Sequence, residues 1–253
     1  MEPPVPLSEV EALLGRLHLG DEGKLGHRES KKATQVHALL GHVGALLNKA
    51  SRRRELQLVD AAAGRGHVAA ALAALLLPAM ALRGHVLACE WDPRRVDRAV
   101  ARMAECGIGG VEVVATPVAE LILDQPPDLV VGLHACGTAS DDVIELVIHS
   151  GAARLALVPC CHPRRPDLLS RSDLPVQGEC ADRVTSATLD ALRVLRLEAA
   201  RFRVDTTALG AAAVTGRDLV ILARQSGSRA RAERAKEALA RWGKGGAAER
   251  GRT

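Results

Sequence analysis

Aromatic residues are nearly absent from this sequence. Its 253 residues include one Phe (Phe202), two Trp (Trp91 and Trp242) and no Tyr. The core must therefore be packed from Leu, Val and Ala. Rows of aromatic side chains that stack on nucleic-acid bases are disfavoured for the same reason.

Long hydrophobic runs are also lacking. The longest run, Val68 to Leu82, has about 15 residues and is broken at Pro78, whereas a membrane-spanning helix needs roughly 20. The chain opens on Met-Glu-Pro-Pro, unlike a signal peptide. We therefore expect a cytoplasmic protein with no membrane segment, in which the six cysteines stay reduced.

The net charge of +4 comes from one end of the chain. Residues 224–253 contain nine Lys and Arg and three acidic residues, a net +6, so the rest of the chain carries −2. This pattern is typical of a solvated tail or of a non-specific RNA-binding appendage.

Apolar strands alternate with helical segments over most of the chain. Strands are expected at 56–60, 85–90, 111–115, 128–133 and 155–159, with helices at 68–82, 94–106 and 141–149. A helix at 185–197 and two strands at 200–205 and 218–223 follow. This order predicts an α/β fold with a mostly parallel sheet, helices on both faces and an antiparallel edge.

Three regions are expected along the chain. Residues 1–29 form an amino-terminal lead-in, and residues 30–224 form one α/β domain that begins with a helix capped by Ser30. Residues 225–253 form a basic tail that is partly helical and then disordered.

A glycine-containing turn follows the first predicted strand. It runs Asp60-Ala-Ala62-Ala-Gly64-Arg-Gly66, and such turns let a nucleotide approach the backbone closely. The third position of a dinucleotide motif is Ala69 and not glycine. Because the carboxylate of Asp60 repels phosphate but attracts an ammonium group, the turn favours S-adenosylmethionine over NAD.

Acidic and aromatic residues end the second predicted strand. Glu90 is placed to accept the ribose hydroxyls, and Trp91 to flank the adenine. An acidic residue here serves NAD equally well, so Glu90 indicates only an adenosine-containing cofactor.

Reactive side chains also follow the fourth and fifth predicted strands. His134 is our first candidate for a general base and His162 the second, because an imidazole titrates near neutrality. Cys136, Cys160 and Cys161 are expected on the substrate side. Zinc binding and a redox switch stay open as alternatives, although the missing Cys-x-x-C spacing leads us to expect no metal.

These motifs together resemble a known family. Asp60-x-x-x-Gly64-x-Gly66, His134-Ala-Cys-Gly137 and Cys160-Cys-His162 are similar to motifs of the methyltransferase-domain family that includes the eukaryotic tRNA acceptor-stem 2′-O-methyltransferase. The resemblance spans Ser30 to Arg224.

The resemblance implies a Rossmann-like class I fold with seven strands, S-adenosylmethionine as methyl donor and RNA as a partner. Ala62 departs from the family pattern, which has glycine there. Lys31 and Lys32 resemble the family's lead-in and are placed to contact an anionic acceptor or simply to be solvated. A non-catalytic S-adenosylmethionine- or RNA-binding protein and an NAD-dependent oxidoreductase are the alternatives.

Overall fold

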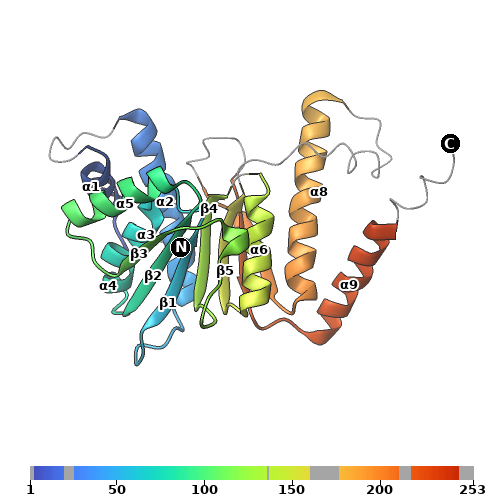
Figure 1. Ribbon diagram of the computed structural model, residues 1–253. Coiled ribbons are helices and arrows are strands. Elements are labelled where there is room, and N and C mark those ends of the chain that lie inside the picture. The colour runs from blue at the N-terminus through green and yellow to red at the C-terminus, as the bar shows by residue number, and fades with distance from the viewer. Residues whose placement is uncertain (1–2, 20–25, 136, 160–176, 211–217, 245–253) are drawn as a thin grey trace.

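A seven-stranded sheet forms the centre of the protein (Figure 1). The computed structural model describes residues 3–19, 26–135, 137–159, 177–210 and 218–244. The strands are β1 (Leu56–Ala61), β2 (Gly84–Glu90), β3 (Val111–Ala115), β4 (Leu129–Ala135), β5 (Arg154–Pro159), β6 (Arg203–Ala208) and β7 (Leu219–Arg224).

The strand directions agree with the expected fold class. The order across the sheet is β3-β2-β1-β4-β5-β7-β6. Strands β1 to β5 are parallel, whereas β7 is antiparallel to both β5 and β6. The prediction of a mostly parallel sheet closed by an antiparallel pair is confirmed, with β7 lying one strand in from the edge.

Helices cover the two faces of the sheet (Figure 1). One side carries α1 (Leu7–Leu19), α2 (His27–Leu47), α3 (His67–Ala71), the π-helical turn η2 (Leu72–Leu76), α4 (Leu77–Ala79) and α5 (Pro93–Glu105). The other carries α6 (Ala139–Ser150), α8 (Gly178–Ala199) and α9 (Arg229–Lys244). Within the described residues, no helix is both long and apolar enough to cross a membrane.

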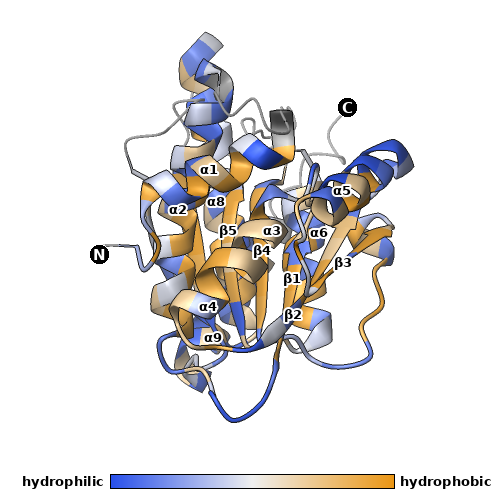
Figure 2. Cartoon of the chain, turned by 90° about the vertical axis from the view of Figure 1, so that its left-hand side faces the viewer, coloured by the Kyte–Doolittle hydropathy of each residue, from blue (hydrophilic) through white to orange (hydrophobic). Residues whose placement is uncertain are grey.

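Each face of the sheet has its own apolar core, and Figure 2 shows the central strands of the sheet as strongly hydrophobic. Successive strand residues point to opposite faces, so Leu58 packs in one core and Val59 in the other. Leu13 and Leu14 of α1 are buried in the first core together with residues of α2. The amino-terminal helix is therefore packed against the sheet-covering layer.

One local expectation is wrong, and another is confirmed with a local irregularity. The helix expected from Ser30 begins at His27, after Gly26, and has no side-chain cap. The apolar segment expected as one helix at 68–82 is helical without a break from His67 to Ala79, as α3, η2 and α4, with a π-helical turn at Leu72–Leu76 inside it.

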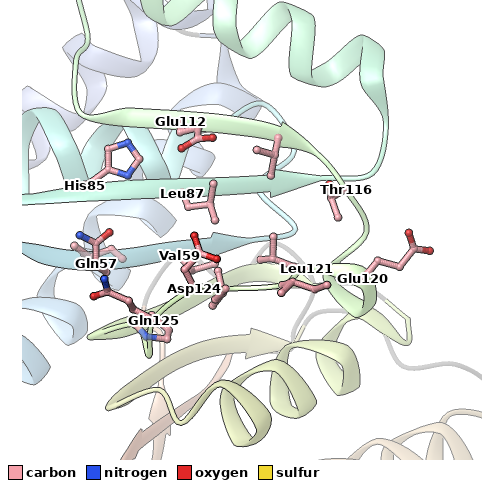
Figure 3. Close-up of a pocket in the computed structure, with 15 residues that line it drawn as sticks. Gln57, Val59, His85, Leu87, Glu112, Thr116, Glu120, Leu121, Asp124 and Gln125 are labelled. Carbon is pink, nitrogen blue, oxygen red and sulfur yellow. The ribbon is translucent and has the colours of Figure 1, made fainter.

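The connection from β3 to β4 contains only the short 3₁₀ turn η3 (Val118–Glu120). Because no long helix covers this part of the sheet, a hollow of about 560 Å³ remains beside Val59 and Leu87 (Figure 3). Glu112, Glu120 and Asp124 also line it. No residue of the glycine-containing turn lines this hollow.

Candidate functional site

A second cavity, of about 440 Å³, lies at the carboxyl ends of β1, β2 and β4. In an open α/β sheet this edge is where ligands bind. The cavity brings together residues that are far apart in the sequence. Those that line it are Lys32, Asp60, Ala62, Ala63, Gly64, Arg65, His67, Val68, Glu90, Trp91, Arg95, Leu133, His134 and Ala139.

The glycine-containing turn adopts left-handed backbone angles at three positions. The φ angles are +60° at Ala62, +62° at Gly64 and +74° at Gly66. Glycine takes these angles without strain, whereas an alanine does so at a cost of about 1–2 kcal/mol. Ala62 and Gly64 line the cavity, and Gly66 lies outside the lining and starts α3.

Asp60 places a buried carboxylate against the cavity. Its side chain is 1% exposed, and its Oδ2 accepts a hydrogen bond of 2.9 Å from the backbone N–H of Ala69. Burial raises the pKa of Asp60 to about 7, although the Ala69 hydrogen bond and the charge of Lys32 partly offset that effect. Asp60 is therefore poised to ionise when a cation approaches.

Glu90 ties the turn to the end of β2. Its Oε2 accepts from the N–H of Gly64 at 2.8 Å, and its Oε1 accepts from the N–H of Asp92 at 3.2 Å. Arg95 Nη1 lies 3.7 Å from Oε1. Trp91, 65% exposed, follows on the cavity wall. Glu90 thus has a structural role in holding the turn, whatever the cavity binds.

His134 lies at an irregular point of β4. Its φ is +64°, and the pairing of β4 with β5 shifts register between Leu133 and Ala135. Its Nε2 lies 2.8 Å from Oε1 of Gln35, which is buried in α2. Non-glycine residues with such backbone angles cluster at functional sites.

The expectation that His134 titrates near neutrality is wrong. Burial, with a smaller effect from the charge of Lys32, lowers the pKa of His134 to about 4. The imidazole is therefore neutral at pH 7, and it is a weaker base than a solvent-exposed histidine.

Lys31 and Lys32 are separated by the geometry of α2. Lys32 lines the cavity, whereas Lys31 is exposed and does not. The sequence did not single out Gln35, Arg65 or Arg95, because Arg65 occupies a variable position of the glycine-containing motif and the other two lie outside the motifs. Cys136, Cys160, Cys161 and His162, together with the end of the tail at 245–253, lie outside the described residues.

Comparison with known proteins identifies the family. A family model described as a methyltransferase domain matches residues 31–164, more than half of the chain. No curated protein sequence matches the chain.

Solved structures with a similar fold include magnesium protoporphyrin IX methyltransferase from Synechocystis PCC 6803. Its complex with SAM has a TM-score of 0.52 and 15% identity, covering 87% of this chain and 97% of that chain. Its complex with SAH has a TM-score of 0.52 and 16% identity, and the match covers 83% of this chain and 92% of that chain. An rRNA methylase from Streptococcus thermophilus has a TM-score of 0.49 and 15% identity, and the match covers 74% of this chain and 96% of that chain. From the match at 31–164 and the strand order of its sheet, the chain belongs to the methyltransferase-domain family and is a methyltransferase with the class I fold of enzymes that use S-adenosylmethionine.

Proposed function

We propose that this protein transfers a methyl group from S-adenosylmethionine, held in the cavity at the ends of β1, β2 and β4, to a hydroxyl group of RNA. The observation that carries the proposal is the cavity itself. It combines acidic groups suited to a cationic nucleoside, the glycine-containing turn and a neutral imidazole. Asp60, Ala62, Gly64, Gly66, Glu90 and Trp91 are the proposed cofactor-binding residues.

The cavity residues fit the cofactor group by group. The buried carboxylate of Asp60 suits the α-ammonium of the methionine end through a charge-assisted hydrogen bond. Glu90 has further lone pairs for the ribose hydroxyls, and the exposed indole of Trp91 is available to cover the adenine. A Cβ at Gly64 would meet no protein atom within 4 Å, so this position faces open space that a ligand can occupy.

The same groups disfavour a dinucleotide. Asp60 and Glu90 both border the turn where a pyrophosphate would have to lie, and carboxylates repel phosphate. NAD binding also normally uses a complete glycine motif, which this chain lacks at Ala69.

Bound S-adenosylmethionine supplies a methyl group on a positively charged sulfur that leaves as a neutral thioether. The chain has to align the acceptor oxygen with that group and receive the hydroxyl proton. This proton becomes strongly acidic as the oxygen bonds to carbon, so a neutral imidazole with a low pKa is a sufficient acceptor. We assign the role to His134, and His162 remains our second candidate.

Basic side chains around the cavity support RNA as the acceptor. Lys32, Arg65 and Arg95 line the cavity, and α5 exposes Arg94 and Arg98 one turn apart. Figure 2 shows much of α5 in the hydrophilic colour. Arginine and lysine bind a nucleic acid mainly through its phosphates. The resemblance to an acceptor-stem 2′-O-methyltransferase makes tRNA the first RNA to test.

The test is transfer of tritium from methyl-labelled S-adenosylmethionine to a deproteinised tRNA pool. We expect label in the RNA that ribonuclease releases and protease does not. Binding of S-adenosylhomocysteine without any label in RNA would remove RNA as the acceptor and leave the cofactor assignment intact.

A pair of double variants tests the RNA surface. Arg94→Ala with Arg98→Ala should weaken tRNA binding and lower the slope of log affinity against log salt by about 1–2. Arg52→Ala with Arg53→Ala is the matched control, because these arginines are exposed before β1, away from the cavity. Equal effects of the two pairs would show that α5 is not the contact surface.

A further inference from the structure

Gln35 is a buried polar residue beside the proposed proton acceptor. It lies on α2, three residues after Lys32, and is 3% exposed. Its Oε1 is 2.8 Å from Nε2 of His134, which is 99 residues away in the sequence. A buried amide is seldom retained in a core unless it is hydrogen-bonded, and here it meets the imidazole that borders the cavity.

The contact determines which nitrogen of His134 carries a proton. A carbonyl oxygen can only accept a hydrogen bond, so Nε2 must be the protonated nitrogen. In a neutral imidazole the other nitrogen, Nδ1, then has the free lone pair. We propose that Gln35 is a positioning residue: it fixes His134 as the Nε2–H tautomer and thereby assigns Nδ1 to receive the proton of the methyl acceptor.

The surroundings of His134 support this role. Its backbone is held at a φ of +64° at the irregularity of β4, so the ring projects from a fixed point. Lys32, one turn before Gln35, also lines the cavity, and its positive charge disfavours a protonated imidazole. One helix therefore supplies both the group that orients the ring and a group that keeps it neutral.

The role of Nδ1 as proton acceptor rests on the proposed function, whereas the Nε2–H tautomer of His134 does not. In the transfer, a bond forms between the acceptor oxygen and the methyl carbon as the carbon–sulfur bond breaks. The sulfur keeps that electron pair, and the hydroxyl proton passes to Nδ1. The imidazolium so formed carries a proton on each nitrogen and returns the Nδ1 proton to solvent.

The tautomer is tested first, by long-range ¹H–¹⁵N NMR of protein with ¹⁵N-labelled histidine. The chain has nine histidines, so the His134 signals are identified by their loss in His134→Asn. We expect a neutral ring with the proton on Nε2 from pH 6 to pH 8. A proton on Nδ1, or a rapid mixture of the two tautomers, would overturn the inference whether or not the protein methylates RNA.

Two substitutions of Gln35 separate positioning from packing. Gln35→Met keeps the volume but removes the acceptor, so the single tautomer pattern should be lost. Gln35→Glu keeps the acceptor and adds a negative charge, so Nε2–H should persist and the pKa of His134 should rise by about 1–3 units. Lys32 and Asp60 face the same cavity and are unchanged in both variants.

Thr34→Val is the matched control. It removes a 3.0 Å hydrogen bond of the same helix, from Thr34 Oγ1 to the carbonyl oxygen of Ser30, and leaves the bond between Gln35 and His134 in place. The NMR pattern of His134 should not change in this variant. If Thr34→Val and Gln35→Met alter that pattern alike, the effect belongs to the helix and not to the Gln35 amide, and the inference fails.

The kinetic test uses transfer to tRNA under saturating S-adenosylmethionine. Gln35→Met should lower kcat at least tenfold, a part of the 10²–10⁴ that a general base contributes. The affinity for S-adenosylhomocysteine should change less than threefold. In the His134→Asn background, Gln35→Met should cause no further loss, because Gln35 acts through His134. Additive losses in the double variant would overturn the positioning role.

Discussion

The carboxylate of Asp60 destabilises the ligand-free protein at neutral pH, so replacing it with Asn should stabilise the fold. Asp60 is 1% exposed, and burial raises its pKa to about 7 from an ordinary value of 3.8. A raised pKa means that the folded protein binds this proton more tightly than the unfolded chain does. The contribution of Asp60 to the free energy of unfolding is therefore largest below pH 3.8 and is lost as the pH rises to about 7.

The size of the effect follows from the shift. A difference of about three pKa units corresponds to about 4 kcal/mol of unfolding free energy at pH 8, at 1.36 kcal/mol for each unit. Asn keeps an oxygen that can accept from the N–H of Ala69, so only the weakening of that bond reduces the gain. We expect Asp60→Asn to be more stable than the wild type by about 2–4 kcal/mol at pH 8.

Urea unfolding of the ligand-free proteins at pH 5, 6, 7 and 8 measures this difference. It should be about 2–3 kcal/mol smaller at pH 5 than at pH 8, grow as the pH rises and level off above pH 7. Asp124→Asn replaces an exposed carboxylate and should change stability by less than about 0.5 kcal/mol at every pH. An Asp60→Asn variant that is less stable than the wild type at pH 8 would refute the raised pKa of Asp60. A gain in stability that is the same at every pH would refute it as well.

Three further predictions concern the cavity. Gly64→Ala and Gly107→Ala both place alanine at a left-handed position with open space around Cβ, so they should lose similar stability in thermal unfolding. Only Gly64→Ala should also weaken S-adenosylhomocysteine binding measured by calorimetry. Equal affinities of the Gly64→Ala and Gly107→Ala variants would contradict the proposed placement of the ligand beside Gly64. The free energy of unfolding should rise by about 0.5–1 kcal/mol in Ala62→Gly and in the distant control Ala81→Gly, because both alanines have positive φ. No rise in either variant would show that the backbone strain is absent. His134 has a lowered pKa, so its contribution to stability is full above pH 6.5 and is lost toward pH 4. Relative to His134→Asn, the free energy of unfolding of the wild type, measured with urea, should fall by about 2–3 kcal/mol between pH 6.5 and pH 4. Equal pH dependence of stability in the two proteins would contradict the lowered pKa of His134.

Most strand positions were predictable because their residues are predominantly apolar, although the strand expected at 200–205 is observed at Arg203–Ala208. The run from Leu56 to Asp60 gave a strand observed at Leu56–Ala61, and residues 111–115 were predicted with the observed bounds. A parallel sheet covered on both faces requires such runs, so the local pattern and the fold coincide. Helix starts were less predictable: α2 begins after Gly26 without a side-chain cap, and no local pattern marks such a start.

The motifs predicted several of the residues that line the cavity, but not the protonation state of its histidine. Asp60, Gly64 and Glu90 follow from the order of strands and turns, because parallel strands end at the same edge of the sheet. The lowered pKa of His134 depends on burial and on a charge from α2, which no local pattern contains. Gln35 is one polar residue in an amphipathic helix, and only its contact across the fold distinguishes it.

Calorimetric titration with S-adenosylhomocysteine, and separately with NAD, tests the central claim most directly. The wild-type protein should bind S-adenosylhomocysteine with micromolar affinity and should not bind NAD. Asp60→Asn, although more stable, should lose at least tenfold in affinity, because the charge that holds the α-ammonium is gone. Binding of NAD, binding of neither ligand, or unchanged affinity in Asp60→Asn would contradict the assignment of this cavity to S-adenosylmethionine.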